Sequence, residues 1–216
     1  MKARFLILAL LSSTIVHAEP DGNRSQIQVT IPGMTKPVSL VVPSGFRPAS
    51  TESEKRERSK LIRAVQESPS GKGIFTDVYR TRWGSSTLLP ILYVGTLPAA
   101  VRVQGQVKAS DWKEFRSLTV KQARAQLPAI EQQLARIGHS PVTSALNRIL
   151  LGADANTLVI LGFSSVAENH LSPMLMARKL RYVRQSMVLF EVAIDASSPR
   201  AAETLEQYVK QIDVKE

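Results

Sequence analysis

The sequence contains no cysteine, and that absence excludes several kinds of site. Disulfide bonds, thiolate zinc sites, iron–sulfur clusters and cysteine nucleophiles all require the missing thiol. Histidine is also scarce, with three residues in 216, and none has a partner at the spacing of a motif such as HxH or HExxH. We therefore predict that the protein holds no metal and no cofactor.

Glycine and proline are too few for a fibrous protein, at 11 and 12 residues. The chain is 44% hydrophobic and 21% charged, which is typical of a folded domain rather than of a disordered chain. A chain of this length can be held together by its core without disulfides. We expect one globular domain over residues 27–216, preceded by a flexible stretch at residues 19–26.

Long uncharged runs are rare, and the first of them begins near the amino terminus. Phe5–Val16 follows the basic residues Lys2 and Arg4 and precedes Ala18, a layout that predicts a secretory signal peptide ending at Ala18. This run is too short for a membrane-spanning helix, which needs about 20 apolar residues. A second run, residues 85–101, is interrupted by two prolines and a glycine, so we expect buried strands there.

The order of the hydrophobic patterns predicts an α+β fold. Strands or extended segments are expected at residues 27–31, 38–42, 74–83, 88–94, 100–107, 157–164, 172–183 and 187–194. Helices are expected at residues 51–67, 110–137, 141–151 and 198–212. Because strands and helices come in clusters, we predict antiparallel sheets packed by a long central helix and a C-terminal helix, in a sandwich-like α-β-α arrangement.

Local signals indicate where the helices begin and end. Thr51–Glu54 matches the capping-box pattern, and Ser110 and Ser198 are expected to cap the two later helices. Pro128 lies inside the pattern of the long helix, which predicts a kink or two abutting helices. Gly138 is expected to end that helix.

The order of elements resembles the α-β-α sandwich of the PsbP-like photosystem subunits. The run Met187–Ile212 (MVLFEVAIDASSPRAAETLEQYVKQI) is similar to the ending of exported bacterial proteins that have a final strand, a turn and a closing helix. The resemblance covers about the last quarter of the chain and contains no catalytic motif. It implies a fold and an exported location, and it assigns no functional residue.

Catalytic patterns are weak in this sequence. Ser110 and Lys113 match S-x-x-K, but two fixed positions arise often by chance, and a helix cap explains the serine without chemistry. Residues 162–166 lack the second glycine of a GxSxG elbow. A hydrolase of unrecognised type, with Ser110, His139 or His170 in a deep pocket beside a base, remains one alternative. A small-ligand carrier with an internal apolar cavity is the other.

Positive charge is what the chain has in excess. Cleavage after Ala18 would remove Lys2 and Arg4 and leave 26 basic against 18 acidic residues, a net charge of +8. One cationic cluster lies on the first predicted helix and comprises Lys55, Arg56, Arg58, Lys60 and Arg63. Its pattern favours a solvated helix surface with i,i+4 pairs over a basic docking face. The predicted binding patch combines basic and aromatic residues from two other segments: Arg80, Arg82, Trp83, Arg178, Lys179, Arg181 and Arg184.

Residues 178–184 place cations alternately on both faces of a strand, which predicts an edge strand or a protruding hairpin. Edge strands also carry such charges simply to block aggregation. We expect a non-enzymatic, periplasmic or secreted protein that binds an anionic envelope component or an acidic partner protein. Export makes nucleic acid an unexpected partner, and no transmembrane segment is expected after residue 18.

Overall fold

The computed structural model describes residues 26–67, 73–85, 89–103, 106–138, 146, 154–164 and 173–215. The predicted signal peptide, the stretch before residue 26 and both His139 and His170 lie outside these residues. The helix predicted at 141–151 also lies outside them, apart from Leu146.

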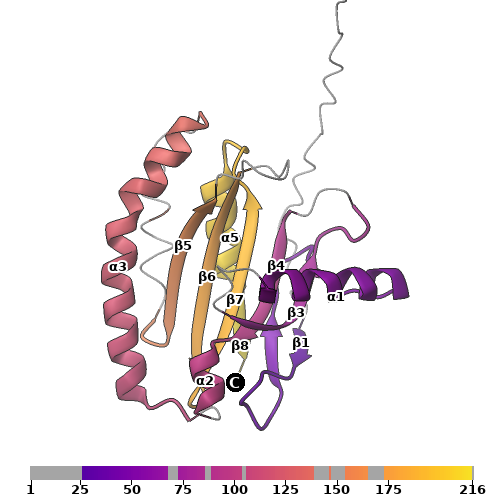
Figure 1. The fold of residues 1–216 in the computed structure, drawn as a ribbon, viewed down its shortest axis with the longest axis vertical. Helices are drawn as coiled ribbons and strands as arrows, with labels where there is room; N and C mark the ends of the chain where they lie inside the picture. Colours follow the sequence, from indigo (N-terminus) through magenta and orange to yellow (C-terminus); the bar gives the residue numbers. More distant parts are fainter. Residues whose placement is uncertain are drawn as a thin grey trace, which may run out of the picture.

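A five-stranded sheet forms the centre of the molecule (Figure 1). Its strands are β3 (Ile74–Arg80), β4 (Ile91–Thr96), β5 (Thr157–Ser164), β6 (Met174–Val183) and β7 (Ser186–Asp195). They lie in the order β3-β4-β7-β6-β5, and every neighbouring pair is antiparallel. The predicted α+β fold with antiparallel sheets is therefore confirmed.

A second, three-stranded sheet lies beside the first (Figure 1). It consists of β1 (Gln26–Val29), β2 (Val38–Val41) and β8 (Asp213–Lys215), with β2 in the middle. The hairpin of β1 and β2 was expected from the sequence. Strand β8 was not, because three residues are too few to show an alternating pattern.

Helices cover both faces of the five-stranded sheet. Helix α5 (Ala201–Gln211) buries its apolar stripe, which includes Leu205 and Val209, in one core with Phe190 of β7. On the other face, Trp112 of α3 (Ala109–Arg136) and Ala100 of α2 (Pro98–Arg102) share a second core with Leu180 and Leu189. Helix α1 (Glu52–Glu67) packs on β3, and α3 runs along β5 (Figure 1).

Several local expectations are confirmed by the structure. The backbone N–H of Glu54 donates to the Thr51 hydroxyl, and the Thr51 N–H donates to the Glu54 carboxylate, both at 3.2 Å, as a capping box requires. Gly138 follows the end of α3 with a φ of 87°, a left-handed conformation that glycine adopts without strain.

Other local expectations are wrong. The segment predicted to be extended at 100–107 contains most of α2, which begins with Pro98 in its first turn, where a missing N–H costs nothing. Ser110 and Ser198 do not cap helices, because α3 begins after Lys108 and α5 begins after Arg200. Pro128 lies within one continuous helix, so the alternative of two abutting helices is wrong.

The strand predicted to lie at an edge is instead an inner strand. β6 is hydrogen-bonded to β5 on one side and to β7 on the other, so the prediction of an edge or a protruding hairpin is wrong. Its cations do point to both faces, but Lys179 is only 8% exposed. The buried and half-buried cations of β6 have carbonyl or carboxylate partners, and the alternating pattern of a strand does not reveal such partners.

The fit of β3 against β4 depends on a glycine. A Cβ atom added at Gly95 would lie 2.7 Å from the Cα of Phe75 and would also collide with the carbonyl oxygen of Ile74. At Gly162 of β5, an added Cβ would meet only the Met176 Cε at 3.5 Å, an ordinary contact. These two strand glycines therefore differ in the space around them.

We predict that Gly95→Ala lowers the free energy of unfolding by at least about 2 kcal/mol, since the clash is with backbone that cannot move aside. The matched change Gly162→Ala should be neutral or stabilising by up to about 1 kcal/mol. Urea denaturation of both variants measures the difference. Equal stability of the two variants would contradict this account of the β3–β4 contact.

Candidate functional site

The seven residues of the predicted binding patch do not form one surface. Arg80, Trp83 and Lys179 are buried, whereas Arg82 and Arg184 are exposed. Arg178 lies on the sheet face covered by α2 and α3, and Lys179 lies on the face covered by α5.

Arg80 and Trp83 hold α1 against the sheet. The guanidinium of Arg80, whose side chain is 1% exposed, forms an ion pair with Glu57 of α1 and lies 5.6 Å from the centre of the Trp83 ring. The Trp83 indole N–H donates to the Arg47 carbonyl at 3.1 Å, and the Gly84 N–H donates to Glu57 at 3.1 Å. These residues therefore have a structural role.

Lys179 and Arg181 join β6 to the C-terminal segment of the chain. The ammonium of Lys179 donates to the carbonyl of Val209 at 2.9 Å and to that of Ile212, at the carboxyl end of α5. This position suits a cation, since the last carbonyls of a helix lack partners and the helix dipole is negative there. Arg181 forms ion pairs with Asp154 at 2.5 Å and with Asp213 of β8 at 3.1 Å.

A row of polar side chains crosses the middle of the other sheet face. Tyr93 of β4 lies directly across from Glu191 of β7, which lies directly across from Arg178 of β6. Glu191 is 6% exposed and forms an ion pair with Arg178. Burial, and then the charge of Glu191, raise the pKa of Tyr93 to about 12, against an opposing effect of Arg80. Sequence reasoning missed this row, although Glu191 is the one charged residue between Met187 and Ile194.

A groove of about 400 Å³ lies between α3 and this face of the sheet. Arg178 lines it, at one end of the polar row. Its other polar lining residues come from α3 and are Thr119, Gln122 and Gln126. Among the described residues, the apolar part of the lining comprises Leu97, Phe115, Ala123, Ile160, Leu180 and Leu189.

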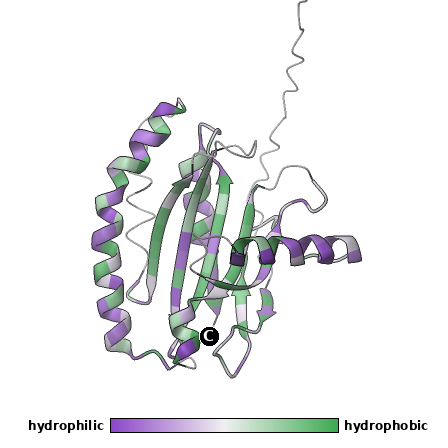
Figure 2. Ribbon diagram, viewed as in Figure 1, coloured by the Kyte–Doolittle hydropathy of each residue, from purple (hydrophilic) through white to green (hydrophobic). Residues whose placement is uncertain are grey.

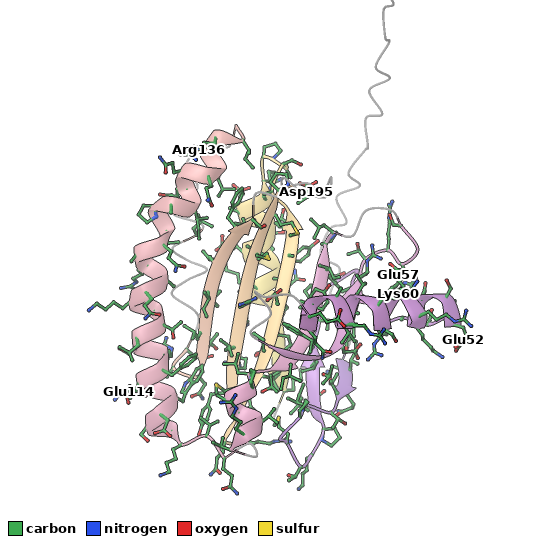
Figure 3. The ribbon with its side chains drawn as sticks, viewed as in Figure 1. Glu52, Glu57, Lys60, Glu114, Arg136 and Asp195 are labelled. Carbon is green, nitrogen blue, oxygen red and sulfur yellow. The ribbon has the colours of Figure 1, made fainter. Side chains whose placement is uncertain are left out.

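The exposed cations of α1 form a second candidate site. Arg56, Lys60 and Arg63 are spaced four and three residues apart, so they share one face of the helix. All three are exposed, and within the described part of the chain none has an ion-pair partner. We call these three residues the basic ridge. Figure 3 labels Lys60 close to Glu57, whose carboxylate forms the ion pair with Arg80.

The opposite side of α1 explains why the basic ridge points outward. Leu61, Ile62 and Val65 are half-buried against the sheet, and Arg58 pairs with Asp77 of β3 at 2.7 Å. No residue of α1 is fully buried, and the helix is coloured mostly hydrophilic in Figure 2. The exposed Arg82 belongs to the turn that Gly84 fixes to Glu57, so this cation lies beside the same helix.

Other candidate chemistries find no support in the described residues. No group of three or more metal-ligating side chains gathers in this part of the chain. Ser110 is exposed and its hydroxyl donates to Asp111 at 3.0 Å, and none of the described groove-lining residues is a serine or a histidine. None of the described helices is long and apolar enough to cross a bilayer.

Comparison with protein-family models and with curated proteins finds no match for this chain. The resemblance to the PsbP-like fold and the export that it implies therefore remain predictions. The groove and the basic ridge are the two candidate sites in the described part of the chain.

The ion pair of Arg178 with Glu191 can be tested by measuring stability. Glu191→Leu should lower the free energy of unfolding by about 2–3 kcal/mol, because it leaves the guanidinium of Arg178 without its carboxylate in a partly buried position. The double variant Glu191→Leu/Arg178→Met should recover much of that loss, since both charges are then removed. Urea denaturation of the two variants checks this. A double variant less stable than Glu191→Leu would show that the ion pair does not behave as described.

Proposed function

We propose that this protein is an exported, non-enzymatic protein that binds an anionic phospholipid surface through the basic ridge of α1. The observation that carries the proposal is the cluster of three exposed cations, Arg56, Lys60 and Arg63, within two turns of one helix and without an ion pair to any described residue. Clustered cations of this kind attract acidic head groups by about 1 kcal/mol each.

The shape and composition of the ridge favour a lipid surface over a protein partner. Protein interfaces have a core of aromatic and other apolar side chains, from which lysine is depleted. The three ridge side chains are all charged, and the large apolar residues of α1 (Leu61, Ile62 and Val65) pack against the sheet. A straight row of cations on a projecting helix (Figure 1) can approach a flat layer of phosphates without such a core.

Export supports the choice of partner. The signal peptide predicted at residues 1–18 would bring the protein to a membrane surface and away from nucleic acid. The net charge of +8 that remains after cleavage would favour an anionic surface over a distance set by the salt concentration. Binding is accordingly expected to be reversible and electrostatic.

The test is co-sedimentation of the purified protein with vesicles of phosphatidylcholine containing phosphatidylglycerol, compared with phosphatidylcholine alone. We expect binding to the anionic vesicles, and its loss between about 0.1 M and 1 M salt, where the screening length falls from about 10 Å to 3 Å. The variant Arg56→Glu/Lys60→Glu/Arg63→Glu should bind about a hundredfold more weakly.

A matched control distinguishes the contribution of the ridge to binding from that of the net charge. Lys113, Lys121 and Arg124 are exposed on α3, which also exposes Glu114 on its outer side (Figure 3). Reversing these three changes the net charge equally but should leave most of the binding intact. Equal losses in the two variants, or binding unaffected by salt, would contradict the proposal. A neutral variant, with glutamine at positions 56, 60 and 63, replaces the charge-reversed variant if the three glutamates unfold α1.

A further inference from the structure

The groove between α3 and the sheet contains no residue of the basic ridge. Its volume of about 400 Å³ lies within the range of about 300–1,000 Å³ that is typical of small-molecule sites. Leu180 and Leu189, each 1% exposed, are lining residues that belong to the sheet. Phe115 contributes from α3 and is 37% exposed, so part of its ring is available to a ligand there.

The hydrogen-bonding groups of the groove are concentrated on one wall. Thr119, Gln122 and Gln126 are spaced three and four residues apart on α3 and share one face of the helix. Hydroxyl and amide groups donate and accept hydrogen bonds without carrying charge. The sheet side is mainly aliphatic. A fitting molecule would place an apolar body against the sheet and uncharged polar groups toward α3.

The charge in the groove is compensated. Arg178 is the one charged side chain among the described lining residues, and its Nε donates to the buried carboxylate of Glu191. An anionic ligand would have to compete with Glu191 for the guanidinium, whereas a cationic ligand would be repelled by Arg178. The ion pair therefore favours a ligand without net charge.

We propose that this groove binds an uncharged amphiphile, a molecule with an aliphatic body and a hydroxyl or amide head. This ligand differs in charge from the surface that the basic ridge would bind, and the two sites lie on different helices, α3 and α1. Binding in the groove is therefore independent of the proposed function and should be insensitive to salt.

The test compares decanol, decanoate and decyltrimethylammonium, which share one chain and differ in the charge of the head group. Each compound is titrated against the purified protein as a competitor of N-phenylnaphthylamine, an uncharged probe whose fluorescence rises in apolar surroundings. We expect decanol to displace the probe at a concentration on the order of tenfold lower than either ion. The Arg56→Glu/Lys60→Glu/Arg63→Glu variant should give the same result as the wild type.

Two tryptophan variants locate the binding site on the protein. Gln122 and Gln132 are both exposed residues of α3, but only Gln122 is among the residues that line the groove. Gln122→Trp fills the groove and should weaken decanol binding on the order of tenfold, whereas Gln132→Trp should not change it. Thr119→Trp serves as a second filling variant if Gln122→Trp does not fold.

The results that overturn the proposal are equally definite. An absence of probe binding, tighter or equal binding of either ion, or the same decanol affinity in the filling variant and the Gln132→Trp control would each exclude a groove for uncharged amphiphiles. Tighter binding of decanoate would instead indicate that the guanidinium of Arg178 leaves Glu191 for an anionic ligand.

Discussion

Burial of the Lys179 ammonium on β6, an inner strand of the five-stranded sheet, requires hydrogen-bond acceptors within reach, because a desolvated cation without them costs several kcal/mol. The carboxyl end of α5 supplies those acceptors. Two residues further along β6, Arg181 is paired with Asp154, just before β5, and with Asp213 of β8. These contacts fix α5, β8 and the start of β5 relative to one strand, and they connect the two sheets.

On the opposite face of the sheet, cations near the core are also paired. Arg178 is paired with Glu191 and Arg80 with Glu57, so that the cations nearest the core have carboxylates beside them. The basic ridge of α1 is different, because its charges face solvent and have no acidic partners among the described residues. The cations of this protein therefore occupy two environments. Paired cations stabilise the fold, and the exposed cations of the basic ridge are those that we propose bind an anionic surface.

Sequence patterns predicted much of the fold because hydrophobic periodicity depends on local spacing. β5 was predicted at its observed bounds, and the stripe of α5 is buried as expected. The position of β6 was not predictable, because the acceptors of Lys179 are backbone carbonyls about thirty residues away, which carry no sequence signal. Glu191 did carry a signal, as a carboxylate within an apolar strand. The groove carried none, since it forms only where α3 meets the sheet.

The most direct test of the buried ammonium on β6 compares the wild type with Lys179→Met. The free energy of unfolding of both is measured by urea denaturation from about pH 7 to about pH 10. Burial lowers the pKa of Lys179 in the folded chain below its ordinary value of 10.5. At pH values between the lowered pKa of the folded chain and 10.5, the unfolded chain binds more protons than the folded chain. The free energy of unfolding of the wild type should therefore rise with pH relative to that of the variant. A difference that stays constant or falls toward high pH would contradict a buried ammonium at this position.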